Sequence, residues 1–179
     1  MLDKFLDLYC SLLGKIIAIL LALMVVLVFG NVVLRYGFNS GITVSEELSR
    51  WLFVWLTFLG AIVAMKDGAH LGSDTLVSRL PTAGKKLFLI IGHALMLFVC
   101  WLLFKGSYEQ SVINWETTSA VMEASMAFFY GCGMVAAVSI ALILLHKLWR
   151  LFTGDLSENE LVGVRESEEE PIDVPAPLK

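Results

Sequence analysis

The sequence predicts an all-α membrane protein with four transmembrane helices. Of its 179 residues, 58% are hydrophobic and 17% are charged, whereas about half of a soluble domain is apolar. Most apolar residues lie in four runs that contain no Asp, Glu, Lys or Arg: 16–34, 51–65, 87–104 and 127–145. Because a helix needs about 20 residues to cross a bilayer core, we expect spans at about residues 14–35, 44–66, 86–105 and 125–148, within a membrane domain of residues 1–152.

The first span is expected to stay in the membrane as an uncleaved anchor. Its apolar run is preceded by charged residues of both signs: Asp3, Lys4, Asp7 and Lys15. A signal peptide would end at a small-x-small cleavage site. This run ends instead at Leu34, Arg35 and Tyr36.

The start of the second span carries the densest group of polar residues. Thr43 and Glu46 have the spacing of a capping box, and Glu46 and Glu47 in a first turn suit the helix dipole. Arg50 is placed to pair with either glutamate along the helix. Two interpretations stay open: a helix start alone, or a rigid polar surface that contacts a partner.

At the other end of the second span, Lys66, His70 and Asp74 recur every four residues. They would share one face if the helix continued, although Gly68 and Gly72 interrupt this stretch. The alternative is a solvated helix end whose lysine extends toward water.

The third and fourth spans contain residues that bear on a redox role. His93 and His146 raise the alternative of a haem-binding membrane anchor. We expect the two histidines to differ in depth, which argues against haem and favours a hydrogen-bonded structural His93. Cys100 and Cys132 could lie at similar depth; we interpret both as small packing residues. We predict no catalytic, cofactor or metal site, so the chain is not expected to be an enzyme.

Small residues recur every four positions on three spans, which predicts close helix packing. These stripes are Gly14, Ala18 and Ala22; Gly60, Ala64 and Gly68; and Gly133, Ala137 and Ala141. The apolar runs lack the buried carboxylates that ion-coupled transport usually needs. The chain alone is therefore a poor candidate for a translocation path or a self-contained exporter.

The Lys and Arg residues next to the spans predict the orientation. They are more frequent before the first span, between the second and third, and after the fourth, so both termini are expected in the cytoplasm. Residues 153–179 are rich in Glu and Pro and are expected to form a disordered acidic tail.

Four short motifs follow one another between residues 30 and 80. They are Arg35-Tyr36, Glu46-Glu47-x-x-Arg50, Trp55-x-x-Phe58-Leu59-Gly60-Ala61 and Lys66-x-x-x-His70. Together with the four-span plan to Arg150, this set resembles the small membrane subunit of tripartite ATP-independent periplasmic (TRAP) transporters, the DctQ-like family. Val44 and Lys66 depart from that pattern, where an aromatic residue and Arg are common.

The resemblance implies a three-part importer. A periplasmic binding protein would deliver an organic anion, and a large elevator-type membrane subunit would move it with a sodium gradient. This chain would be part of the fixed scaffold, in contact with both proteins and with lipid, and would bind no nucleic acid. The substrate stays open among sialic acid, C4-dicarboxylates, keto acids and ectoine-like solutes. The candidate partner-contact residues are Arg35, Tyr36, Glu46, Glu47, Arg50, Gly60, Ala64, Lys66, His70 and Asp74.

Overall fold

A computed structural model describes residues 2–67 and 82–153. These residues form four helices: α1 (Leu2–Gly37), α2 (Thr43–Lys66), α4 (Thr82–Ile113) and α5 (Ala127–Thr153). All four are long and apolar enough to cross a membrane. The predicted all-α fold with four membrane helices is therefore confirmed.

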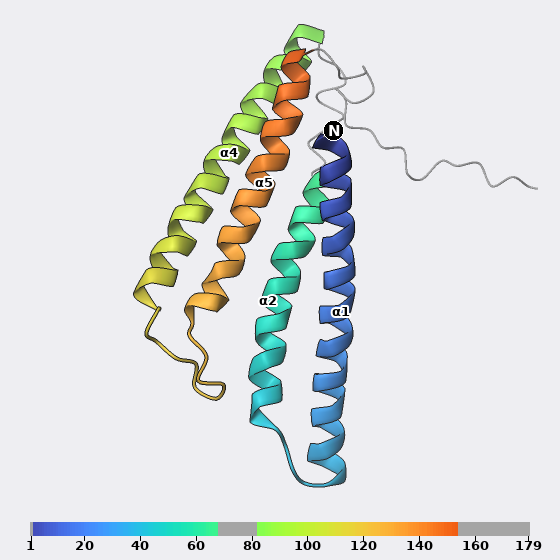
Figure 1. Cartoon of the computed structure of the whole chain (residues 1–179), viewed down its shortest axis with the longest axis vertical. Helices are drawn as coiled ribbons and strands as arrows, with labels where there is room; N and C mark the ends of the chain where they lie inside the picture. Colours follow the sequence, from blue (N-terminus) through green and yellow to red (C-terminus); the bar gives the residue numbers. More distant parts are fainter. Residues whose placement is uncertain (1, 68–81, 154–179) are drawn as a thin grey trace, which may run out of the picture.

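The helices form a row rather than a square bundle (Figure 1). α1 packs on α2, α2 packs on α5, and α5 packs on α4. The loops at 38–42 and 114–126 lie at the same end of the helix axes, and we call this end of the molecule the loop end. The start of α1, the end of α2, the start of α4 and the end of α5 lie at the opposite end, which we call the terminal end (Figure 1).

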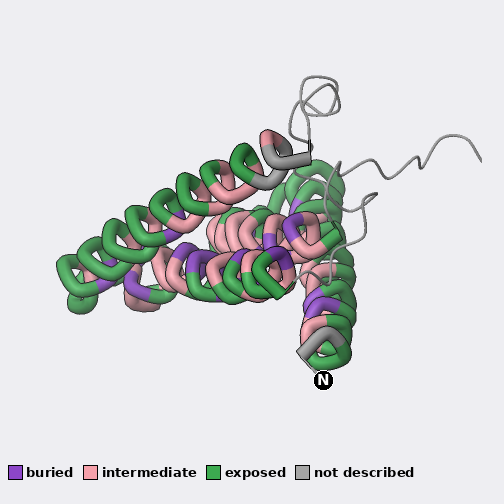
Figure 2. The backbone as a smooth tube through the Cα atoms, turned by 90° about the horizontal axis from the view of Figure 1, so that it is seen from above, coloured by how far each residue is buried: buried purple, intermediate pink, exposed green. Residues whose placement is uncertain are grey.

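This order leaves the two outer helices largely uncovered. In the most apolar 18-residue stretch of each helix, 6% of the residues are buried in α1 and in α4, compared with 22% in α2 and 39% in α5. Figure 2 shows the same contrast, with long exposed stretches along the outer helices. The outer helices must therefore meet lipid or another protein.

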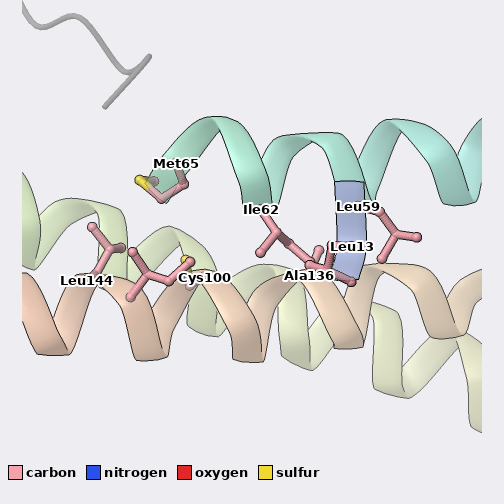
Figure 3. Close-up of a cluster of buried hydrophobic side chains, with 8 residues drawn as sticks. Leu13, Leu59, Ile62, Met65, Cys100, Ala136 and Leu144 are labelled. Carbon is pink, nitrogen blue, oxygen red and sulfur yellow. The ribbon is translucent and has the colours of Figure 1, made fainter. Parts of the chain in front are cut away.

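The core lies where the two central helices meet. Ile62 on α2 and Ile143 and Leu144 on α5 are almost fully enclosed. α1 contributes Leu13 and α4 contributes Cys100 to the same cluster (Figure 3). Figure 3 shows Ile62 pointing from α2 toward the α5 side, where Ala136 lies.

Several helices extend beyond the expected membrane spans. α1 begins at Leu2 and α4 continues to Ile113, well beyond the expected ends at residues 14 and 105. Charged residues need not end a helix, and Lys105 and Glu109 form an i to i+4 pair at 3.8 Å inside α4. α5 likewise extends to Thr153. The expected acidic tail lies almost entirely outside the described residues.

The three small-residue stripes occupy different surroundings. Gly133 on α5 lies so close to α4 that a Cβ there would overlap Ser107 Oγ and lie 3.2 Å from Ser107 Cβ. Ala137 beside it is buried. The stripe on α1 is exposed, and a Cβ on Gly14 or Gly60 would meet no atom within 4 Å. Gly68 lies outside the described residues. Within the described chain, close backbone approach is therefore seen at the α4–α5 crossing.

The antiparallel register of α4 and α5 fixes the relative depth of two pairs of residues. Gly133 lies against Ser107, and Ser111 Oγ donates to the Ala127 carbonyl oxygen at 3.4 Å. Continued along both helices, this register brings His93 to about the level of His146, so the expected difference in depth is wrong.

The same register separates Cys100 from Cys132 by about two helical turns, so the two cysteines do not lie at similar depth. Cys100 lies in the core cluster, and Cys132 donates to the Phe129 carbonyl oxygen at 2.9 Å. Both are buried free thiols, as is Cys10.

Candidate partner-binding site

A buried asparagine organises the loop end of α1 and α2. Asn31 is 8% exposed, and its Oδ1 accepts a hydrogen bond of 2.7 Å from the Ile42 backbone N–H. Its Nδ2 donates to Glu46 Oε1 at 3.3 Å. Nearby, the buried Ser45 hydroxyl donates to the Leu27 carbonyl oxygen at 2.8 Å. These bonds fix the 38–42 loop and the start of α2 onto α1.

The predicted capping box at Thr43 is wrong. Ile42 is the N-cap residue, and no side chain caps this helix end. The reason is tertiary: Asn31 binds the Ile42 N–H from the neighbouring helix and also binds Glu46. Glu46 therefore reaches across to α1 instead of turning back along its own helix.

The two adjacent glutamates have separate partners. Glu46 Oε1 lies 3.7 Å from Arg35 Nη1, and both side chains are more than half exposed. Glu47 Oε2 accepts hydrogen bonds from the Val121 N–H at 2.9 Å and the Met122 N–H at 3.2 Å. Among the described residues, Arg50 forms no ion pair with either glutamate. Its side chain is exposed.

Arg35, Tyr36 and Glu46 line one surface hollow between α1 and α2, together with the buried Asn31. Tyr36 is 84% exposed at its rim. Thus the loop end offers a positive and a negative charge beside an unburied aromatic ring. A protein surface can recognise such a group through charge and stacking contacts.

At the terminal end, two lysines tie helices together. Lys66 Nζ lies 2.7 Å from Asp7 Oδ1 and joins α2 to α1. Lys147 Nζ on α5 donates to the Met65 carbonyl oxygen on α2 at 2.9 Å. α2 ends at Lys66. His70 and Asp74 lie outside the described residues, so their stacking with Lys66 stays a prediction.

Of the small-residue candidates on α2, Gly60 borders open space. Gly60 and Ala64 are partly exposed, and Gly60 has no neighbouring atom within 4 Å of an added Cβ. Sequence reasoning missed Asn31, Asp7 and Lys147 as helix-joining residues. The available signal was a polar side chain at the edge of an apolar run, which did not identify its partner on another helix.

No group of three or more His, Cys, Asp or Glu residues in the described part of the chain is placed to hold a metal ion. His93 Nδ1 donates to the Leu89 carbonyl oxygen at 2.8 Å within α4. The site consists of the charged side chains of Arg35 and Glu46, the hydrogen-bonded Asn31 and the exposed ring of Tyr36.

Residues 24–154 match the family described as tripartite ATP-independent periplasmic transporters, DctQ component. The chain belongs to this family. Its relatives include a TRAP transporter small permease protein of Haemophilus influenzae, which is 40% identical over 72% of this chain and 80% of the relative. A second small permease from the same organism is 34% identical over 82% of this chain and 85% of the relative.

A third relative is the C4-dicarboxylate TRAP transporter small permease protein of Vibrio cholerae. It is 33% identical over 52% of this chain and 40% of the relative. The chain is therefore a small permease subunit of a TRAP transporter, a multi-pass protein of the bacterial inner membrane. The comparisons favour this assignment over the haem-binding anchor.

Proposed function

We propose that this small permease is the scaffold subunit of a sodium-driven importer of an organic anion. It holds a large elevator-type membrane subunit and helps to dock the periplasmic binding protein that delivers the anion. It leaves ion and substrate binding to the other two proteins. The TRAP family membership supports this three-part arrangement.

The observation that carries the proposal is the uncovered apolar surface of the outer helices. On α1, Ile19, Val26 and Phe29 are each about two-thirds exposed, and α4 exposes Leu95 and Val99 at mid-helix. In a bundle that packs only on itself, each helix would contact two neighbours, whereas α1 packs mainly on α2 and α4 mainly on α5. A subunit that packs against a larger membrane protein needs such a face, because helix association in lipid depends on packing area.

Charge distribution supports a passive role in the membrane. The apolar runs of all four spans contain no Asp, Glu, Lys or Arg. Sodium or an anion crossing the bilayer needs charged or polar ligands near mid-membrane. The large subunit is therefore expected to provide these ligands.

The excess of Lys and Arg around the terminal end supports a cytoplasmic location for this end. The loop end, with Arg35, Tyr36, Glu46 and Arg50, then faces the periplasm. A soluble binding protein approaches from that side. We assign no substrate to this chain, since selectivity belongs to the proteins that bind the anion.

Copurification tests the scaffold role. The chain is coexpressed with an affinity-tagged large subunit encoded beside it, and the complex is isolated in mild detergent. We expect a stoichiometric complex. Gly60→Leu on α2 and Gly92→Leu on α4 both project into open space, and each should weaken the complex if its helix face contacts the large subunit. Recovery of the chain as a lone monomer, while the large subunit transports normally, would contradict the proposal.

A further inference from the structure

Glu47 links two parts of the chain that are distant in sequence. The acceptor atom is one carboxylate oxygen on α2, and the donors are the backbone N–H groups of Val121 and Met122, 74 and 75 residues further along the chain. Hydrogen bonds that involve an ionised group are stronger than neutral ones. Successive backbone N–H groups in a turn form a concave site for an anion. At the loop end, this contact joins the α1–α2 pair to the α4–α5 pair.

The bound segment has a defined fold of its own. Residues 117–126 fold back on themselves, with the Ser119 N–H donating to the Ala124 carbonyl oxygen at 2.9 Å and the Met126 N–H to the Thr117 carbonyl oxygen at 2.8 Å. Thr118 and Ser125 form an antiparallel bridge. Glu123 has a positive φ of 55°, which lets the chain reverse. We call residues 117–126 the loop hairpin; its tip is the part that Glu47 binds.

The base of the loop hairpin is also fixed. Ser125 Oγ donates to the Trp115 carbonyl oxygen at 2.7 Å and accepts from the Ala127 N–H at 3.3 Å, where α5 begins. Among the hydrogen bonds of the described residues, those to the Glu47 carboxylate hold the tip to a part of the chain outside the loop. Release of Glu47 should free the tip while the base stays attached.

We propose that Glu47 is a positioning residue that keeps the loop hairpin ordered against the start of α2 for docking of the soluble binding protein. This inference rests on the proposed function, because it assumes that the loop end faces that protein. It differs from the sequence prediction, in which Glu47 contacts the partner directly. One carboxylate oxygen, Oε2, accepts from two backbone donors, and through it Glu47 acts on the hairpin.

The two roles predict different results for Glu47→Gln. The Gln side chain has the same length and keeps a carbonyl oxygen, which can accept from the Val121 and Met122 N–H groups without a charge. A positioning role tolerates this change, whereas a direct charge contact does not. Glu47→Ala removes the acceptor. Because water can then bind both N–H groups, the four helices should still assemble.

The experiment measures substrate uptake by the reconstituted complex across a titration of binding protein. If docking needs an ordered hairpin, Glu47→Ala should raise the half-saturating concentration about tenfold and leave the maximal rate unchanged, because fewer complexes are competent to dock. Glu47→Gln should stay within about threefold of the unmodified complex. Hydrogen exchange of the peptide covering 117–126 should quicken in Glu47→Ala and remain slow in Glu47→Gln.

The inference is overturned if the Glu47→Ala titration overlays the unmodified one, or if Glu47→Gln is as defective as Glu47→Ala. If Glu47→Ala fails to assemble, unprotected 117–126 amides in the unmodified complex overturn it, and protected amides with a near-normal Glu47→Gln support it. If the unmodified complex shows no dependence on binding protein, the proposed docking function itself fails, which is a separate result.

Discussion

Lys147 on α5 donates a hydrogen bond from Nζ to the carbonyl oxygen of Met65 on α2 at a distance of 2.9 Å. Met65 is the penultimate residue of α2, so its carbonyl lacks a partner within the helix. A cation at a helix C-terminus is also favoured by the helix dipole. The Lys147 side chain therefore caps the C-terminal end of α2 and joins α2 to α5 where the core cluster ends.

Lys147→Met should destabilise the chain by about 1 to 2 kcal/mol, because it keeps the apolar stem but leaves the carbonyl unpaired. Thermal unfolding of the purified protein in detergent measures the effect. Lys105→Met is the matched control, since Lys105 forms an exposed pair with Glu109 and should cost less than about 0.5 kcal/mol. Equal effects of the two changes would show that the Lys147 bond contributes nothing specific.

Gly133→Ala should loosen the α4–α5 crossing. The added Cβ overlaps Ser107 Oγ, and the nearby Ser107 Cβ leaves little room for adjustment. Overpacking of this kind costs about 1 to 3 kcal/mol. In the same unfolding measurement, adding Ser107→Gly to Gly133→Ala should restore the lost stability. Gly131→Ala, which meets no atom within 4 Å, should be nearly neutral. A neutral Gly133→Ala would mean that the helices are further apart than described.

Arg50→Glu should weaken docking more than assembly. Arg50 is exposed at the loop end and forms no ion pair with Glu46 or Glu47, so reversing its charge should change stability by no more than about 0.5 kcal/mol. Charge on a docking surface acts mainly on association rate and orientation. We expect a severalfold higher half-saturating concentration of binding protein in uptake assays, with an unchanged yield of complex. The matched control is Arg50→Gln, with a smaller shift; overlay of all three titrations would remove Arg50 from the docking surface.

The sequence predicted the helices well because membrane insertion depends on local composition. Each apolar run became a membrane helix, and the lack of charge inside the runs required no knowledge of packing. Helix ends were harder. Lys105 marked the expected end of the third span, but the helix backbone continues through its pair with Glu109.

The contacts of the site could not be predicted because they join different helices. Glu46 and Glu47 are adjacent, yet one reaches α1 and the other reaches the loop hairpin. Capping-box spacing at Thr43 is a local signal, and Asn31 on another helix overrode it. The row order was equally hidden, because four similar apolar helices give no sign of which two lie in the centre.

Reconstituted uptake measures whether the transporter needs this chain. The large membrane subunit and the binding protein are placed in liposomes with an inward sodium gradient, either with this chain or without it, and uptake of the anion carried by that binding protein is measured. We predict sodium-dependent uptake only when this chain is present. Full uptake without the chain would contradict its role as the scaffold subunit.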